Sequence, residues 1–309
     1  MKTLLPLLFL LCIALTGYTQ ITDKVLAHVT YTFTHVKDTT DRQNPYKEDM
    51  VLVLGKNSSI YSSYDKILRD REMRKSLQEQ IKNQAGGNQN ISLSNKNTKR
   101  VTTTEYYYFP TQKKYFRKER LINNYFIETL VDQIDWKISP DTMSFSGIAC
   151  QKATAKFKGR NWIAWFATDL SFQAGPWKLN GLPGLIIDAF DDRNDVHFAF
   201  NGFEKISSAV PEKKSEDSPI NGMMIKTIGM ENDVTAAQEI KLPDDAIKTS
   251  KKDFDRLNDA YKKDPQGFMQ TQLAGTGISM KVVQSRPASG SSSPIKQNEE
   301  NNPLELQDK

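Results

Sequence analysis

Residues 25–36 read VLAHVTYTFTHV and carry the clearest structural signal in the chain. From Val25 to Phe33 every second residue is apolar or aromatic, and the residues between them are mostly polar. Successive side chains of a strand point to opposite faces of its sheet, so this period of two predicts a half-buried β-strand. The sheet that contains this strand must therefore bury one apolar face.

Further strands are predicted on the C-terminal side of this stretch. Residues 50–54 and 59–63 form a predicted hairpin around the turn 55–58. A longer run of predicted strands follows, at residues 101–109, 113–121, 124–131, 134–138, 142–157, 162–168, 185–191 and 196–206. Short connections favour a meander over βαβ units, and a large antiparallel sheet with one wet face must twist and curl.

Helices are predicted in two places. Residues 64–83 are charged, with an interrupted apolar stripe and i,i+4 ion pairs. Residues 250–253 form a capping-box pattern ahead of apolar residues at helical spacing, and Asp264-Pro265 begins a second short helix over 266–273. The predicted fold class is mainly β (α+β): one large curved antiparallel sheet, one or two packed helices and a disordered C-terminal tail.

The first 19 residues are typical of an export signal. Lys2 gives a positive start, residues 4–15 are apolar but too short to span a bilayer, and Gly17-Tyr18-Thr19 is a small-x-small cleavage pattern. Cleavage after Thr19 leaves Gln20 first; cleavage after Gln20 is the near alternative. We therefore expect an exported protein, periplasmic or secreted.

The rest of the chain is predicted to form one domain. No internal repeat is found, and two segments are polar and lack periodicity. The expected organisation is a signal peptide at 1–19, a β-rich domain at 20–283 with flexible inserts at 84–100 and 211–243, and a disordered tail at 284–309.

Composition excludes several classes of protein. The 309 residues are 38% hydrophobic and 26% charged, which is enough apolar material for a folded core. No apolar run reaches the roughly 20 residues that a membrane-spanning helix needs. Two cysteines and three histidines leave little for a metal or haem site, so neither metal nor cofactor is expected. Removing Lys2 lowers the net charge from +5 to +4, and this mild basic balance in an exported chain argues against nucleic acid as the partner.

The sequence lacks the common catalytic motifs. G-x-S-x-G, G-x-x-x-x-G-K-[ST], H-E-x-x-H and C-x-x-C do not occur. Cys150 lies within a predicted strand and is interpreted as a packed residue. His197 is two residues from Asp195, which leaves a catalytic His–Asp pair as the less favoured alternative to a surface histidine. The carboxylates at Asp188, Asp191, Asp192 and Asp195 are interpreted as a solvated hairpin turn.

The segment 175–187, GPWKLNGLPGLII, is the most distinctive of the chain. Residues 182–185 have proline and then glycine at their centre, which predicts a type II turn with Gly184 at positive φ. Trp177 and Leu179 are expected to anchor the loop in the core. Upstream, Trp162 and Trp165 lie three residues apart, so a straight strand puts them on opposite faces, with one ring exposed.

The motif residues 181–186 spell GLPGLI, and the chain here resembles the GLPGLI family of exported bacterial proteins. Residues 150–153, 159–165 and 175–177 also resemble that family; the likeness is close over 148–190 and loose over 25–206. It does not extend to 84–100, 211–243 or the tail. The resemblance implies export and a β-rich fold, and it transfers no catalytic residue. The candidate contact residues are Arg160, Trp162, Trp165, Gly175, Pro176, Trp177, Gly181, Leu182, Pro183, Gly184 and Leu185.

The function that these features favour is an exported non-catalytic protein that binds an apolar, lipid-like ligand or a cell-envelope protein. One alternative is a hydrolase whose site combines His197 and Asp195 with a distant serine or threonine. Another is a structural component of the envelope. The motif at 181–186 contains no acid, base or nucleophile, so it suits architecture or contact better than bond-making.

Overall fold

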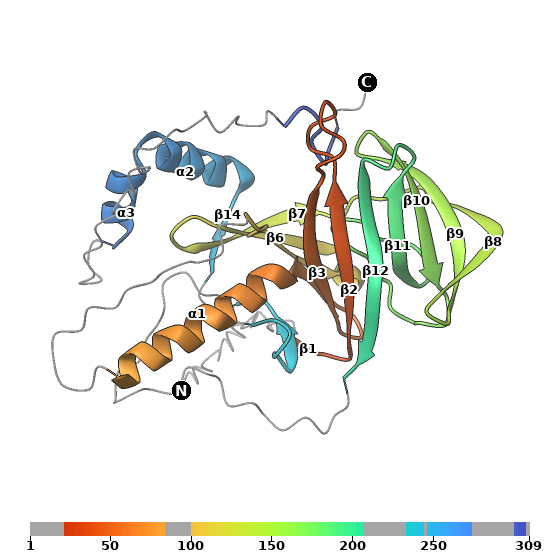
Figure 1. Ribbon diagram of the computed structural model, residues 1–309, viewed down its shortest axis with the longest axis horizontal. Helices are drawn as coiled ribbons and strands as arrows, with labels where there is room; N and C mark the ends of the chain where they lie inside the picture. The colour runs from red at the N-terminus through yellow and green to blue at the C-terminus, as the bar shows by residue number, and fades with distance from the viewer. Residues whose placement is uncertain (1–21, 84–99, 207–232, 244–245, 274–299, 307–309) are drawn as a thin grey trace, which may run out of the picture.

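The computed structural model describes residues 22–83, 100–206, 233–243, 246–273 and 300–306 (Figure 1). Within these ranges the chain forms a twelve-stranded sheet, a two-stranded sheet and three α-helices, which confirms the mainly β class. No helix in them is long and apolar enough to cross a membrane. The helices are α1 (Tyr64–Asn83), α2 (Lys251–Lys263) and α3 (Pro265–Leu273), with a 3-10 turn at Pro110–Gln112. The strands are β1 (Thr22–Lys24), β2 (Ala27–His35), β3 (Tyr46–Leu54), β4 (Ser59–Ser63), β5 (Glu105–Phe109), β6 (Lys114–Arg120), β7 (Asn124–Leu130), β8 (Lys137–Phe145), β9 (Ile148–Phe157), β10 (Arg160–Ala167), β11 (Leu185–Asp191), β12 (Val196–Lys205), β13 (Glu239–Lys241) and β14 (Ile247–Thr249).

The large sheet is built from two meanders that meet in its middle. The strand order is β14-β7-β6-β5-β4-β3-β2-β12-β11-β10-β9-β8. The chain enters at β2, steps outward to β7, crosses to the far edge at β8, and steps back to β12, which pairs with β2. Every neighbouring pair is antiparallel except β14 with β7.

A short connection forces this sheet to curl. Strands β7 and β8 lie ten places apart in the strand order, which is about 48 Å in a flat sheet. Only residues 131–136 join them, and an extended chain of that length reaches about 25 Å. The sheet therefore bends until its two halves approach each other, as the sequence predicted.

Both faces of the central strands are buried. On β2, Val29, Tyr31 and Phe33 point into the larger core cluster, which confirms the predicted alternation. That cluster also takes in residues of β9–β12 and the loop at 168–184, which we call the core loop. A second cluster lies on the other face of β3, where α1 and β13 cover it.

Two hairpin turns of the structure differ from the sequence prediction. Residues 142–157 were predicted to be one strand, but the chain reverses at Ser146-Gly147, with φ of 48° and 85°, and separates β8 from β9. The next reversal, which the predicted strands place between residues 157 and 162, lies at Lys158-Gly159, with φ of 48° and 71°, so that β10 begins at Arg160. Both are two-residue hairpin turns, whose twist requires positive φ at both central residues.

The helix signals at 250–265 are confirmed. The Ser250 hydroxyl oxygen accepts the backbone N–H of Asp253 at 3.1 Å, which caps α2. The Asp264 carboxylate accepts the backbone N–H of Gly267 at 2.9 Å, and α3 begins with Pro265.

The predicted disorder of the tail at 284–309 is wrong for residues 300–306. These residues lie against the end of β2 and the β9–β10 turn, and Asn302 is buried (Figure 1). Several predicted segments lie outside the described residues. They are the signal segment, residues 84–99 of the insert predicted at 84–100, most of the insert at 211–243, and residues 284–299 and 307–309 of the tail. Within the second insert, residues 239–241 form β13 and pair with β1.

Candidate functional site

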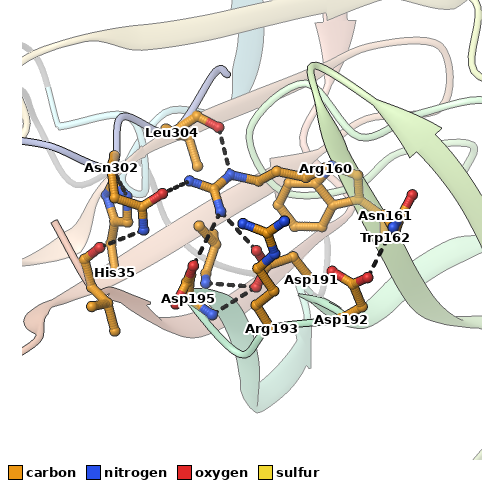
Figure 2. Close-up of polar contacts among 12 residues, drawn as sticks. His35, Arg160, Asn161, Trp162, Asp191, Asp192, Arg193, Asp195, Asn302 and Leu304 are labelled. Carbon is orange, nitrogen blue, oxygen red and sulfur yellow. Dashed lines mark hydrogen bonds and ion pairs between the residues drawn. The ribbon is translucent and has the colours of Figure 1, made fainter. Parts of the chain in front are cut away.

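Arg160 is the first residue of β10, directly after the hairpin turn at Lys158-Gly159. Its side chain is 1% exposed and lies at the centre of a network of polar contacts (Figure 2). The turn needs glycine at 159 for its positive φ. An added Cβ there would also lie 2.6 Å from the Cβ of Leu306, so the missing side chain leaves room for the C-terminal segment.

The Arg160 guanidinium divides its hydrogen bonds between an acid and a peptide segment. Nη1 donates to a carboxylate oxygen of Asp191 at 2.7 Å. Nη2 donates to the side-chain oxygen of Asn302 at 2.9 Å and to the carbonyl of Pro303 at 2.6 Å, and Nε donates to the carbonyl of Leu304 at 2.9 Å. The planar fork of arginine suits such multiple recognition, and each bond is charge-assisted.

The acidic side of the network is also buried, and the prediction of solvated carboxylates is wrong for three of the four aspartates. Asp191 accepts the backbone N–H groups of Asp195 and Val196 at 2.7 and 2.9 Å, so it holds its own turn as well as the guanidinium. Asp195 lies between Arg160 at 4.0 Å and Arg42 at 2.5 Å. A buried carboxylate needs such partners, and the sequence did not show that Arg160 lies across the hairpin.

Asn302 uses every polar group it has. Its backbone N–H donates to the Lys37 carbonyl at 3.1 Å, and its side-chain amide donates to the Val36 carbonyl at 2.7 Å. Its carbonyl accepts from His35 Nε2 at 2.8 Å, and its side-chain oxygen accepts from Arg160 (Figure 2). We call Arg160, Asp191, His35 and the backbone carbonyls of Val36 and Lys37 the Arg160 site.

His35 acts in this site as a neutral donor. Burial lowers its pKa below the usual 6.5, although the bond to the Asn302 carbonyl opposes the shift. A carbonyl oxygen only accepts, so the proton of the neutral ring must lie on Nε2. Protonation would add a buried positive charge beside Arg160 and Lys37, which also lower the pKa.

The core loop fills the inside of the curled sheet. Two side chains from separate segments donate to its carbonyls: Tyr115 to Trp177 at 3.0 Å and Trp136 to Asn180 at 2.7 Å. Tyr31 donates to the carbonyl of Ile186, just beyond the loop in β11, at 2.7 Å. Trp177 packs on Trp162, with ring centroids 5.8 Å apart. Most of the predicted contact residues are therefore core: Arg160, Trp162, Trp165, Gly175, Pro176, Trp177, Leu182, Gly184 and Leu185 are buried, whereas Gly181 and Pro183 are exposed.

The predicted burial of Leu182, Leu185 and Ile187 is confirmed, with exposures of 2%, 0% and 0%, but the predicted type II turn is wrong. Gly184 is not at positive φ; in this loop Gly181 is, at 90°. The constraint at Gly184 is steric, because an added Cβ would overlap the carbonyl oxygen of Ala167, with the carbonyl carbon at 2.8 Å.

Neither tryptophan of β10 offers an exposed aromatic surface. Trp162 is 1% exposed and Trp165 is 8% exposed. Trp165 belongs to the same core cluster as Trp162; the ring of Phe145 lies 6.2 Å away, and the ammonium of Lys152 lies 6.0 Å from its centroid. The predicted exposed ring is therefore covered by a neighbouring strand.

The candidate catalytic residues are not assembled. His197 contacts Asp188 at 3.0 Å rather than the predicted Asp195, because Asp188 lies across the β11–β12 pair. No serine, threonine or cysteine of the described residues hydrogen-bonds to His197. Cys150 is packed as predicted, and burial raises the pKa of its thiol to about 11. The described residues contain no group of three metal-ligating side chains.

One small cavity lies between β4–β6 and the core loop. It has about 10 Å³ of free space, room for about one water molecule, and its lining includes Tyr61, Tyr106 and Trp177. The Tyr61 hydroxyl is buried and has no hydrogen-bond partner among the described residues, so a water molecule would satisfy it.

Comparisons with known proteins add little. No protein-family profile and no curated protein sequence matches the chain. Two solved structures of PNGF-II, in the P21 and C2 space groups, are similar at 13% and 12% sequence identity, with TM-scores of 0.41 and 0.40. The likeness covers 61% and 60% of this chain, and the chain spans 30% and 28% of those two chains.

Proposed function

We propose that this chain is an exported, non-catalytic protein that binds a protein partner of the cell envelope. The observation that carries the proposal is the Arg160 site. It holds an extended peptide segment through a buried cation and through side-chain and backbone groups from three parts of the chain. Contacts of this kind recognise a polypeptide.

The filled interior favours a protein partner over an enclosed apolar ligand. A pocket for a lipid-like molecule needs roughly 300–1,000 Å³ lined with apolar groups. Inside the curl, Trp162, Trp177 and Leu179 occupy the space instead, and the cavity beside the core loop has room for about one water.

The chemistry of the reactive residues also supports a binding role. A cysteine nucleophile needs a lowered pKa and a nearby base, whereas burial raises that of Cys150. The Asp188–His197 pair would need a hydroxyl or thiol beside the ring, and the described residues supply none. Export is supported by the apolar N-terminal segment of the sequence.

The test combines fractionation with a matched variant. A C-terminally tagged chain is expressed in the cells that produce it, and its N-terminus is sequenced. We expect a mature chain that begins at Gln20 or Ile21, in the envelope or the medium, and cross-links to a defined envelope protein. Arg160→Gln should lose the cross-link, whereas Arg193→Gln, a change at an exposed arginine beside the same turn, should keep it.

Three results would contradict the proposal. The first is an uncut chain in the cytosol. The second is a lipid in the organic extract of the purified protein, at one molecule per chain. The third is a hydrolytic activity that disappears in His197→Ala.

A further inference from the structure

We propose that the Arg160 site is a sequence-specific recognition site for an extended peptide that presents asparagine followed by proline. The chain's own residues 301–305 occupy it, and the same site binds such a peptide offered by another molecule. This inference rests on the proposed partner-binding function, for which it names the chemistry of the partner.

The polar groups of the Arg160 site are complementary to an asparagine side chain and backbone. At position 302 both side-chain groups and both backbone groups are paired, and the side chain is buried. Aspartate at this position would place a carboxylate oxygen against the Val36 carbonyl, two acceptors facing each other without a proton. Alanine would leave an Arg160 donor and the Val36 carbonyl without partners. The site therefore selects one residue type.

The docked segment has the form of an extended peptide. Residues 302, 304 and 306 are buried or half-buried and alternate with exposed residues 301, 303 and 305, which is the period of an extended chain. Backbone groups carry the rest of the recognition: the carbonyls of Pro303 and Leu304 accept from Arg160, and the Leu306 N–H donates to the Lys158 carbonyl at 3.0 Å. Proline has no N–H to satisfy, and its fixed φ lowers the entropy lost on binding.

The residues that form the Arg160 site all belong to the β-rich domain and not to the docked segment. Asp191 holds the guanidinium of Arg160, and Asp191 is in turn held by two backbone N–H groups of its own turn. The carbonyls of Val36 and Lys37 follow β2 directly. Gly159 leaves the space that Leu306 fills. Without the segment, the bonds of Asp191 to Arg160 and to its own turn would remain, and Nε and Nη2 of Arg160 would be available to a peptide.

The chain's own C-terminal segment competes with an external peptide for the Arg160 site. The segment is joined to α3 by residues 274–299 of the same chain, so it competes with a peptide from another molecule at a fixed effective concentration. A peptide from another molecule must exceed that concentration or displace the segment. Weakening the tethered segment should therefore open the site to the external peptide.

The experiment uses the full chain and a fluorescent synthetic peptide of residues 299–309. We expect Asn302→Ala to bind this peptide at least tenfold more tightly than the wild-type chain does, by fluorescence anisotropy. The control is Arg193→Gln, because Arg193 is exposed and lies outside both the Arg160 site and the docked segment; it should behave as wild type. A peptide with alanine at position 302 should bind none of the chains.

A folded Asn302→Ala chain that does not prefer the asparagine peptide overturns the proposal. If that variant does not fold, the wild-type chain with a protease site introduced between residues 285 and 290 is cleaved instead. We then expect the C-terminal fragment to stay bound on gel filtration and to exchange with the labelled peptide. Cleaved chain that does not exchange shows a permanent structural contact and also overturns the proposal.

The two proposals fail separately. If the peptide does not bind but the envelope partner still cross-links, the recognition site is wrong and the function stands. If the peptide binds with asparagine specificity but no envelope partner is found, the site stands and the proposed function fails.

Discussion

Replacing Gly184 by alanine tests why the core loop needs glycine at this position. The added Cβ would overlap the carbonyl oxygen of Ala167, and Thr168 Cα lies 3.2 Å away. All three contacts are backbone atoms at the end of strand β10, so no side chain can rotate away. Forcing a methyl group into such a site costs about 3 kcal/mol. In a domain of this size that lowers the Tm by roughly 6–12 °C.

Two matched variants separate steric overlap from backbone strain. Gly202→Ala is the control, because its Cβ would meet only Thr30 Oγ1 at 3.5 Å and φ there is not positive; we expect a change within about 1 kcal/mol. Gly184→Asn distinguishes the explanations, because asparagine tolerates positive φ better than alanine does. We expect Asn to destabilise at least as much as Ala. The measurement is urea unfolding followed by tryptophan fluorescence. Wild-type stability in Gly184→Ala, or a clear advantage of Asn over Ala, would refute the reasoning.

The remaining predictions concern the Arg160 site and the thiol. Asp191→Ala leaves a buried Arg160 without its carboxylate and should cost about 3–5 kcal/mol in chemical denaturation; a loss below 1 kcal/mol would show that the pair is not buried in solution. Because His35 has a folded-state pKa below its unfolded value of 6.5, its contribution to stability is complete above pH 6.5 and is lost as the pH falls toward the folded pKa. NMR titration of the His35 ring should give a pKa below 6.5, and a value above 6.5 would contradict its burial. Cys150 should react with a thiol reagent at neutral pH only as fast as the domain unfolds, so labelling faster than unfolding would contradict its packing and its raised pKa.

Local patterns predicted the elements well because the signals lie within each element. The alternation in residues 25–36, the capping residue Ser250 and the proline at 265 each depend on neighbours within a few positions. The Ser146-Gly147 turn was missed, because residues 142–157 were predicted to form a single strand. The curl of the sheet follows from the short connection at 131–136 together with the strand order that places β7 and β8 ten places apart. No local pattern showed that order, and residues 134–136 were predicted to begin a strand.

The candidate site depends on contacts that no local pattern shows. Asp191 is 31 residues from Arg160 and Asn302 is 142 residues from it, so their pairing appears only in the folded chain. Composition favoured disorder for the tail, whereas Asn302-Pro303 in a polar segment was the one local sign of a defined conformation. At Gly184 the residue was identified correctly and the reason was not, because steric approach to Ala167 cannot be read from the turn pattern.

The docking of residues 300–306 in solution is the claim on which the site depends. Hydrogen exchange tests it directly, because the Asn302 and Leu306 amides donate to the Lys37 and Lys158 carbonyls. We predict that both amides are protected in the wild-type chain and exchange at unstructured rates in Arg160→Gln, while the Ile186 amide, bonded to the Ala174 carbonyl, keeps its protection. Unprotected Asn302 and Leu306 amides in the wild-type chain would contradict the account.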